Sequence, residues 1–169
     1  MDSYLEQLRQ ELEETMTAAS PDLMNNGPAG KWTPAQVLEH LYLTYCNTNK
    51  GLAACLEKGM PLGTRATLRH RVSTLVVVNL AYLPKGRKAP DRAVPKGMPA
   101  EEVRRAILPA IQQMDAGYAE CERRFGPRAR ILEHPILGPL NVGQWRKFHW
   151  VHGKHHARQI RERLGKTSG

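Results

Sequence analysis

Apolar residues recur at three- and four-residue steps over most of the chain, a spacing that predicts amphipathic helices rather than strands. Near the start of the chain this spacing is carried by Leu5, Leu8, Leu12 and Met16. We therefore expect a first helix over about residues 3–18. The residues that follow, 21–30, are rich in Pro, Asn and Gly and are expected to form a loop.

The second helix has clear start and stop signals. Thr33 can cap the helix, Pro34 suits its first position, and Gln36 stands where a capping box requires Glu or Gln. The apolar spacing continues to about residue 58, and Gly59 follows. Glycine is the usual residue just beyond a helix end, so we expect a helix over about residues 34–58.

The segment 64–82 has two interpretations. Its residues 73–78 are β-branched enough for a strand, whereas Leu68, Val72 and Leu75 keep helical spacing. We favour a short helix because no partner strand is evident. The following residues, 84–99, contain four prolines and three lysines and predict a long loop that serves as a crossover, a lid or a mobile segment.

Two more long helices complete the predicted architecture. Pro99 opens a helix that runs to about residue 125, and Asn141 caps a final helix that ends near Gly165. Residues 127–140 are expected to form a loop. Four long helices and one shorter one predict an all-α fold, a helical bundle with at least one crossover connection, in a single domain over 1–169.

The charge is strongly basic, with 25 Lys and Arg against 16 Asp and Glu, a net charge of +9. Such a balance favours nucleic acid, anionic lipid or acidic ligands. The densest basic group lies in the predicted loop, at Lys85, Arg87, Lys88, Arg92 and Lys96. No aromatic residues alternate with these side chains, as single-strand binding would require, so we favour a solvated basic surface over a nucleic-acid site.

No segment has the roughly 20 consecutive apolar residues of a membrane span, and the N-terminus lacks the pattern of a secretory leader. We expect neither a membrane partner nor export. The cysteines, Cys46, Cys55 and Cys121, are odd in number and form no CxxC pair, which is typical of reduced, buried thiols. The expected compartment is the cytoplasm.

Histidines cluster in the last predicted helix. His152 and His156 lie one turn apart on its inward face, where side chains four residues apart can contact one cation. HExxH zinc helices use the same spacing, but the glutamate of that motif is absent here, which excludes its protease chemistry. His40, on the inward side of the second helix, is the best third ligand, although a single core histidine is often only hydrogen-bonded.

Other polar residues share these predicted faces. His149 could replace a ligand or donate to a substrate, whereas His155 points about 100° away from His156 and is expected to be solvated or to support a ligand. Gln36 and Gln159, with Thr44 and Asn47, could orient ligands, or could be ordinary polar residues at helix margins. His70 and His134 are expected to be structural.

Three neutral imidazoles leave coordination positions open for water or substrate, as a catalytic metal requires; a structural zinc site would close with a fourth ligand. Nitrogen ligation suits zinc, nickel or another late divalent ion. Bound to such a metal, water or a thiol becomes a nucleophile near neutral pH.

These residues resemble a known family. Trp32-Thr33-Pro34, the segment 37–41 around His40, and the segment 152–160, which reads HxxHHxxQ, are similar to the DinB/YfiT-like superfamily. The resemblance implies a four-helix bundle with an unusual crossover, often dimeric, and metal ligands at His40, His152 and His156. The additional helix near 68–82 and the basic loop depart from the minimal family pattern and could cover the substrate pocket.

The resemblance also implies a function. Members include metal-dependent hydrolases and thiol S-transferases that use low-molecular-weight thiols, so we expect such an enzyme acting on a small molecule. The alternative is a non-catalytic, metal-stabilised protein whose basic surface binds nucleic acid or other anions. A family member that binds metal without turnover would have the same sequence features.

Overall fold

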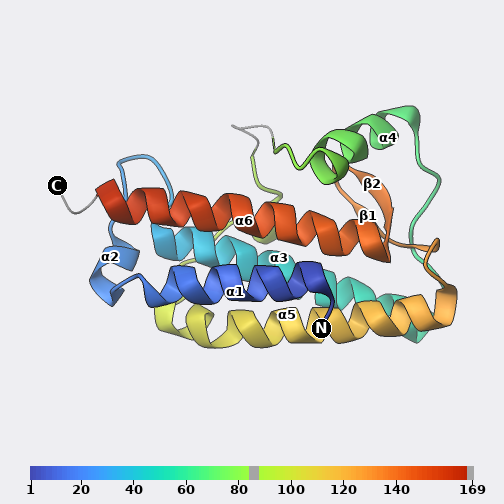
Figure 1. Ribbon diagram of the computed structural model, residues 1–169, viewed down its shortest axis with the longest axis horizontal. Coiled ribbons are helices and arrows are strands. Elements are labelled where there is room, and N and C mark those ends of the chain that lie inside the picture. The colour runs from blue at the N-terminus through green and yellow to red at the C-terminus, as the bar shows by residue number, and fades with distance from the viewer. Residues whose placement is uncertain (84–87, 167–169) are drawn as a thin grey trace.

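Helices dominate the computed structural model, which describes residues 1–83 and 88–166 (Figure 1). The predicted all-α class is confirmed; one small hairpin is the only sheet within the described residues. The helices are α1 (Ser3–Thr17), α2 (Pro21–Asn25), α3 (Pro34–Lys58), α4 (Leu68–Thr74), a π-helical turn η1 (Leu75–Asn79), a 3-10 turn η2 (Asp91–Ala93), α5 (Ala100–Phe125) and α6 (Val142–Lys166). The strands are β1 (Arg130–His134) and β2 (Gly138–Asn141).

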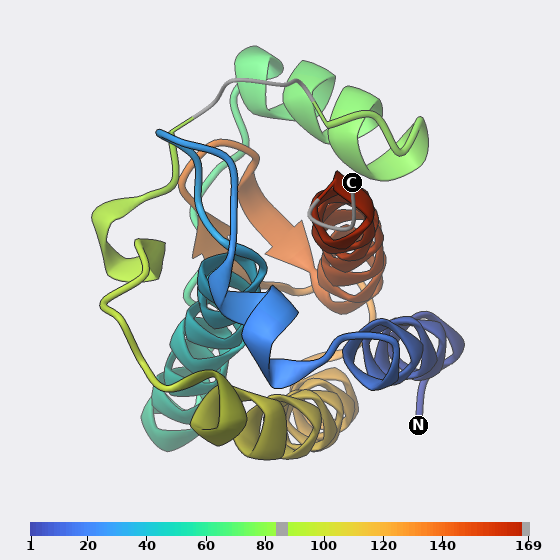
Figure 2. The ribbon, with the colours of Figure 1, turned by 90° about the vertical axis from the view of Figure 1, so that its left-hand side faces the viewer.

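Four long helices, α1, α3, α5 and α6, lie side by side in both ribbon views (Figures 1 and 2). Helix α3 packs against α5 and α6, and α1 packs against α6 and α5. The colours of Figure 1 show that α3 and α5 run in the same direction, so the chain between them has to return along the length of the molecule. The apolar stripes predicted from sequence meet in one core, and its fully buried members include Leu5, Leu12, Leu38, Leu41, Ile107, Ile111 and Met114.

The sequence signals for the ends of α3 correspond to real hydrogen bonds. The Gln36 amide donates to Thr33 Oγ1 at 3.2 Å, and the Thr33 amide donates to Gln36 Oε1 at 2.9 Å. At the other end Gly59 adopts φ 66°, a left-handed conformation that glycine accepts without steric cost. These caps explain why the predicted bounds of α3 match the observed ones.

Helices α1 and α6 approach each other closely at Gly153. A Cβ at this position would collide with Leu8 Cδ1 and would lie 3.1 Å from the Tyr45 hydroxyl oxygen. Leu8 and Tyr45 are themselves buried, so their side chains have little room to move away from an added methyl group. Glycine between His152 and His156 therefore lets α6 lie against α1 while its histidines face α3.

Within the segment 64–82, residues 68–79 are helical, as favoured from the sequence. Helix α4 continues into the wider π turn η1, in which the Leu80 amide donates to the Leu75 carbonyl at 3.0 Å. Val77 and Val78 reach the core, while Thr74 Oγ1 donates to the Leu137 carbonyl at 3.2 Å. These contacts attach α4 and η1 to the outside of the long helices.

Two predicted loops contain regular structure. Residues 127–140 hold the antiparallel pair β1 and β2, which pairs His134 with Gly138. A further segment extends the pairing, because the Leu62 amide donates to the Ile131 carbonyl at 2.9 Å. The loop prediction was wrong here, because residues 130–134 and 138–141 pair with each other across a tight turn. Within 21–30, Ser20 caps the short helix α2, which the loop prediction also missed.

Candidate metal centre

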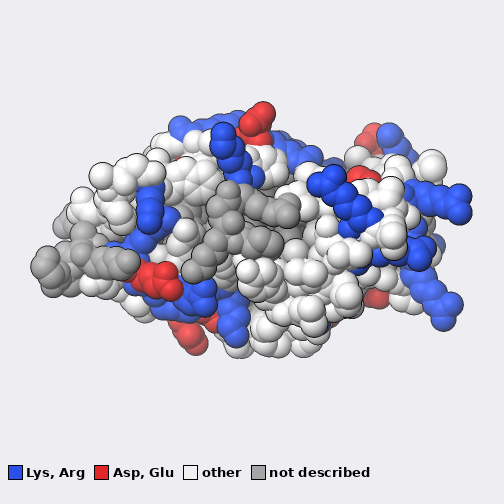
Figure 3. Space-filling view, turned by 90° about the horizontal axis from the view of Figure 1, so that it is seen from above, with Lys and Arg blue, Asp and Glu red and all other residues white. Residues whose placement is uncertain are grey.

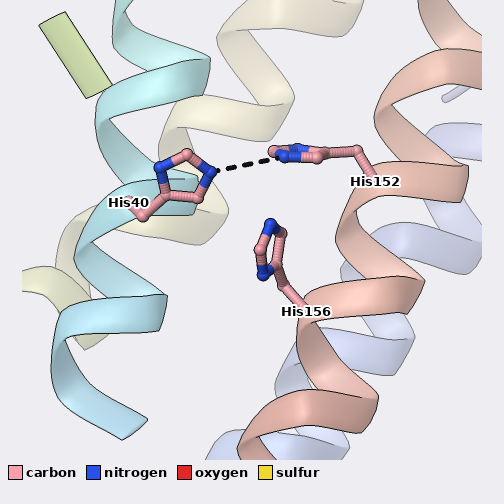
Figure 4. Close-up of side chains that lie close together, drawn as sticks. All are labelled: His40, His152 and His156. Carbon is pink, nitrogen blue, oxygen red and sulfur yellow. Dashed lines mark hydrogen bonds between the residues drawn. The ribbon is translucent and has the colours of Figure 1, made fainter. Parts of the chain in front are cut away.

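His40 from α3 and the pair His152 and His156 from α6 point toward one another between the two helices (Figure 4). Their ring centroids lie 5.3 Å apart for His40 and His152, 4.9 Å for His40 and His156, and 4.6 Å for His152 and His156. One ligand nitrogen from each ring lies within 4.8 Å of the others. The three histidines are therefore close enough to hold one metal ion.

One pair of ring nitrogens is separated by about the length of an edge of a metal coordination tetrahedron. His40 Nε2 and His152 Nε2 lie 3.3 Å apart. Two nitrogens bound to zinc at about 2.0–2.1 Å with tetrahedral angles would be about 3.3 Å from each other. This pair of rings could accept an ion without separating.

Two of the three rings are oriented by a hydrogen bond at the opposite nitrogen. His40 Nδ1 lies 2.7 Å from the Ala93 carbonyl oxygen, and His156 Nδ1 lies 2.9 Å from Gln159 Oε1. Because both oxygens are acceptors, each Nδ1 carries the proton and each Nε2 keeps its lone pair. Partners of this kind orient metal-binding histidines in general.

His152 is oriented by packing instead. Its ring stacks on Phe148, with centroids 5.4 Å apart and planes 14° from parallel. Its Nδ1 is buried and has no hydrogen-bond partner among the described residues. Its Nε2 instead lies 3.3 Å from Nε2 of His40, on the side where an ion would lie.

Burial keeps all three histidines neutral. Desolvation lowers the pKa of His40, although its bond to Ala93 opposes the shift. Desolvation, reinforced by the neighbouring histidines, lowers the pKa of His156 to about 3 and that of His152 well below its usual value. Neutral imidazoles are the form that binds metals, so the ligand set is competent at neutral pH.

A buried carboxylate that the sequence analysis missed fixes the position of Ala93. Glu39, only 1% exposed, accepts the backbone amides of Lys96 at 2.6 Å, Gly97 at 3.1 Å and Met98 at 3.2 Å. This carboxylate therefore anchors the chain that carries the acceptor for His40. The available signal was a charged residue inside a run of buried positions, between Leu38 and His40.

The polar residues predicted to support the ligands have different roles in the structure. Gln159 contacts a ligand, but Gln36 uses its side-chain oxygen to cap α3. His149 is fully buried in the core, where its Nε2 lies 3.3 Å from Thr48 Oγ1, so it is not one of the three gathered histidines. The His155 ring lies edge-on to His156, with centroids 5.1 Å apart.

The remaining polar candidates support the backbone. Thr44 Oγ1 donates to the His40 carbonyl at 2.8 Å, and Asn47 Nδ2 donates to the Arg92 carbonyl at 3.0 Å. Asn47 is therefore a second link between α3 and the chain around η2. Trp32, which the sequence analysis used only for the resemblance, lies 5.3 Å from the His40 ring and forms one wall of the centre.

Two other predictions concern residues away from the centre. His134 is structural as expected, because its Nδ1 accepts the amides of Ile136 and Leu137, each at 3.1 Å. Cys55 and Cys121 are buried free thiols, whereas Cys46 is only half-buried, contrary to expectation. In the basic loop, Lys85 and Arg87 lie outside the described residues.

No helix in the described part of the chain is long and apolar enough to cross a bilayer. No curated protein and no solved structure shows significant similarity to the chain. A family model described as a protein of unknown function (DUF1569) matches residues 4–163. Because the match spans most of the 169 residues, the chain belongs to the DUF1569 family.

Proposed function

We propose that the protein binds a divalent metal through His40, His152 and His156 and is a metal-dependent hydrolase or thiol S-transferase acting on a small molecule. The observation that carries the proposal is the arrangement of the three rings. They come from two helices, their nitrogens gather within 4.8 Å, and two of them have the opposite nitrogen hydrogen-bonded. The resemblance to the DinB/YfiT-like superfamily supports the same ligand set.

Zinc or nickel is the ion that we propose. The donors are three neutral nitrogens, which suit late divalent metals better than magnesium or calcium. The separation of 3.3 Å between two of these nitrogens favours tetrahedral zinc. Within the described residues, no Cys, Asp or Glu joins the three histidines to close the coordination sphere. A position thus stays open for water, a thiol or a substrate atom.

A metal in this position would supply Lewis acidity, which lowers the pKa of a bound water or thiol to near neutral. The residues of the chain would hold the geometry. Ala93 and Gln159 keep the protons on the outer nitrogens of His40 and His156, and the stacked Phe148 keeps His152 facing His40. The rings of Trp32 and Phe148 add apolar walls that exclude water.

The test combines metal content with activity. Protein purified without added metal, and the same protein treated with a chelator, would be measured for bound zinc and nickel. Both would then be tested for ester and amide hydrolysis and for transfer of low-molecular-weight thiols to reactive electrophiles. We expect stoichiometric metal and a metal-dependent activity.

A matched pair of variants makes this test specific. His156→Ala should lose both metal and activity, whereas His70→Ala, a histidine on α4 outside the cluster, should keep both. Metal binding without turnover in any assay would contradict the enzymatic part of the proposal and leave a metal-binding protein. A full complement of metal in His156→Ala would overturn the site itself.

A further inference from the structure

Helix α4, the turn η1 and the residues directly after the turn carry an exposed apolar surface. Large apolar side chains are exposed at Leu68 (78%), Val72 (55%), Leu75 (50%), Leu80 (68%) and Tyr82 (62%). Five such residues within fifteen positions form a concentration of apolar surface, not isolated exposed side chains. We call these five residues the α4 surface.

The exposed face of α4 has an apolar stripe bordered by basic side chains. At about 100° per residue, Leu68, Val72 and Leu75 fall within about 60° of one another. Arg71 borders this stripe on one side and Arg69 borders it on the other, and both are exposed. The inner face is occupied by the buried Thr74 and by His70, whose ring packs against Gly138.

The sequence around α4 carries positive charges and no negative ones. From residue 58 to residue 90 the sequence contains seven Lys and Arg and no Asp or Glu, whereas the whole chain has a net charge of +9. Figure 3 views the molecule from the side that carries α4 and shows more Lys and Arg atoms than Asp and Glu atoms around uncharged atoms there. Glu133 contacts this segment, and its carboxylate accepts the Thr64 amide and hydroxyl.

We propose that the α4 surface docks onto an anionic lipid bilayer, with Leu68, Val72 and Leu75 inserted into the interface and Arg69 and Arg71 at the level of the phosphates. Apolar side chains flanked by basic ones are the signature of helices that lie in the headgroup region. The negative surface potential of an anionic bilayer attracts basic residues that lie near it and so strengthens binding. Peripheral docking needs only one exposed face, so it does not require the bilayer-spanning helix that the described residues lack.

Other occupants fit less well. A second copy of the chain would bring the arginines of one α4 toward those of the other, which is repulsive. Nucleic acid would meet the arginines but would leave the aliphatic stripe without a partner. Figures 1 and 2 show α4 standing out from the four long helices, a convex shape suited to a deformable lipid surface.

The test is flotation of the full-length protein with phosphatidylcholine vesicles that contain or lack phosphatidylglycerol. We expect binding only to the anionic vesicles. Leu68→Ser with Val72→Ser should abolish it. Arg69→Gln with Arg71→Gln should weaken it about 25-fold, since each basic residue near an anionic surface contributes about fivefold. All four positions are exposed, so the variants should fold normally.

The control removes the same charge elsewhere. Arg105→Gln with Arg123→Gln alters two exposed arginines of α5, on the opposite side of the molecule from α4 (Figure 1). Equal weakening by both arginine pairs would show that only net charge matters and would overturn the proposal. So would unchanged binding of the serine variant. Self-association without vesicles that the serine variant abolishes would assign the surface to a second copy of the chain instead.

Discussion

His40 and His152, separated by 112 residues in the chain, place their Nε2 atoms 3.3 Å apart. The folding of α3 against α6 alone does not produce this contact, because imidazole rings can rotate. A hydrogen bond to the Ala93 carbonyl orients the His40 ring, and stacking on Phe148 orients the His152 ring.

Glu39→Gln should weaken metal binding although Glu39 does not touch the ion. The amide group would replace one carboxylate oxygen with a donor, which faces the donating amides of residues 96–98. We expect metal affinity to fall by about 10- to 100-fold, and the free energy of unfolding to fall by roughly 2 kcal/mol. Calorimetric titration and urea unfolding measure the two effects.

The control for this variant is Glu57→Gln, because Glu57 lies on the same helix and is exposed. Glu57→Gln should change neither the metal affinity nor the free energy of unfolding. A Glu39→Gln protein with normal metal affinity would show that the segment around Ala93 does not position His40.

Gln159→Ala should lower metal affinity with little change in the fold. Without the acceptor Oε1, the ring of His156 loses the bond that keeps its proton on Nδ1. A loss of about tenfold is typical for removal of such a partner. The neighbouring Arg158→Ala, at an exposed position, should bind metal normally. Equal affinity in the two variants would rule out an orienting role for Gln159.

Gly153→Ala should destabilise the protein. The added methyl group would collide with Leu8 Cδ1 from α1 and press on the hydroxyl of Tyr45 from α3, and both side chains are buried. Overpacking costs about 1–3 kcal/mol, partly offset by the better helix propensity of alanine. Gly143→Ala on the same helix meets only Asn141 Oδ1 at 3.8 Å and should be neutral or slightly stabilising. Thermal unfolding of both variants tests the difference, and an equal effect would contradict the close approach of α1.

The metal-free protein should lose stability as the pH falls below about 6.5. Burial lowers the pKa of His134 to about 4 and that of His149 to about 3. The unfolded chain takes up protons from about pH 6.5 downward, whereas the folded protein excludes them until these lower values. The stability that depends on neutral His134 and His149 is therefore retained above about pH 6.5 and is lost progressively as the pH falls below it. Urea unfolding at about pH 7 and pH 5 should differ by on the order of 2 kcal/mol for each histidine; equal stability would contradict the neutral, buried state.

The helices were predictable from sequence because their ends have local chemical causes. The reciprocal bonds between Thr33 and Gln36 involve residues three apart, so the sequence alone specifies them. The pair Asn141 and Gln144 fixes the start of α6 in the same way. The hairpin β1–β2 was missed although its own pairing is local, because β2 begins with Gly138 and Pro139, residues more typical of a loop than of a strand.

The candidate ligands could be chosen from sequence, but their supports could not. His152 and His156 are separated by one helical turn, and the inward face of α3 led to His40. The acceptor at Ala93 is a backbone carbonyl, which every residue has, so no side chain reveals it. His149 had the right spacing from His152, yet the position of Thr48 on α3 places it in the core instead.

Titration of metal-free protein with zinc tests the central claim most directly. Wild-type protein should bind one ion per chain at neutral pH. Separate replacement of His40, His152 and His156 by alanine should each abolish that binding, while His70→Ala keeps it. A wild-type protein that binds no zinc or nickel, or a triple alanine variant that still binds one ion, would contradict the three-histidine centre.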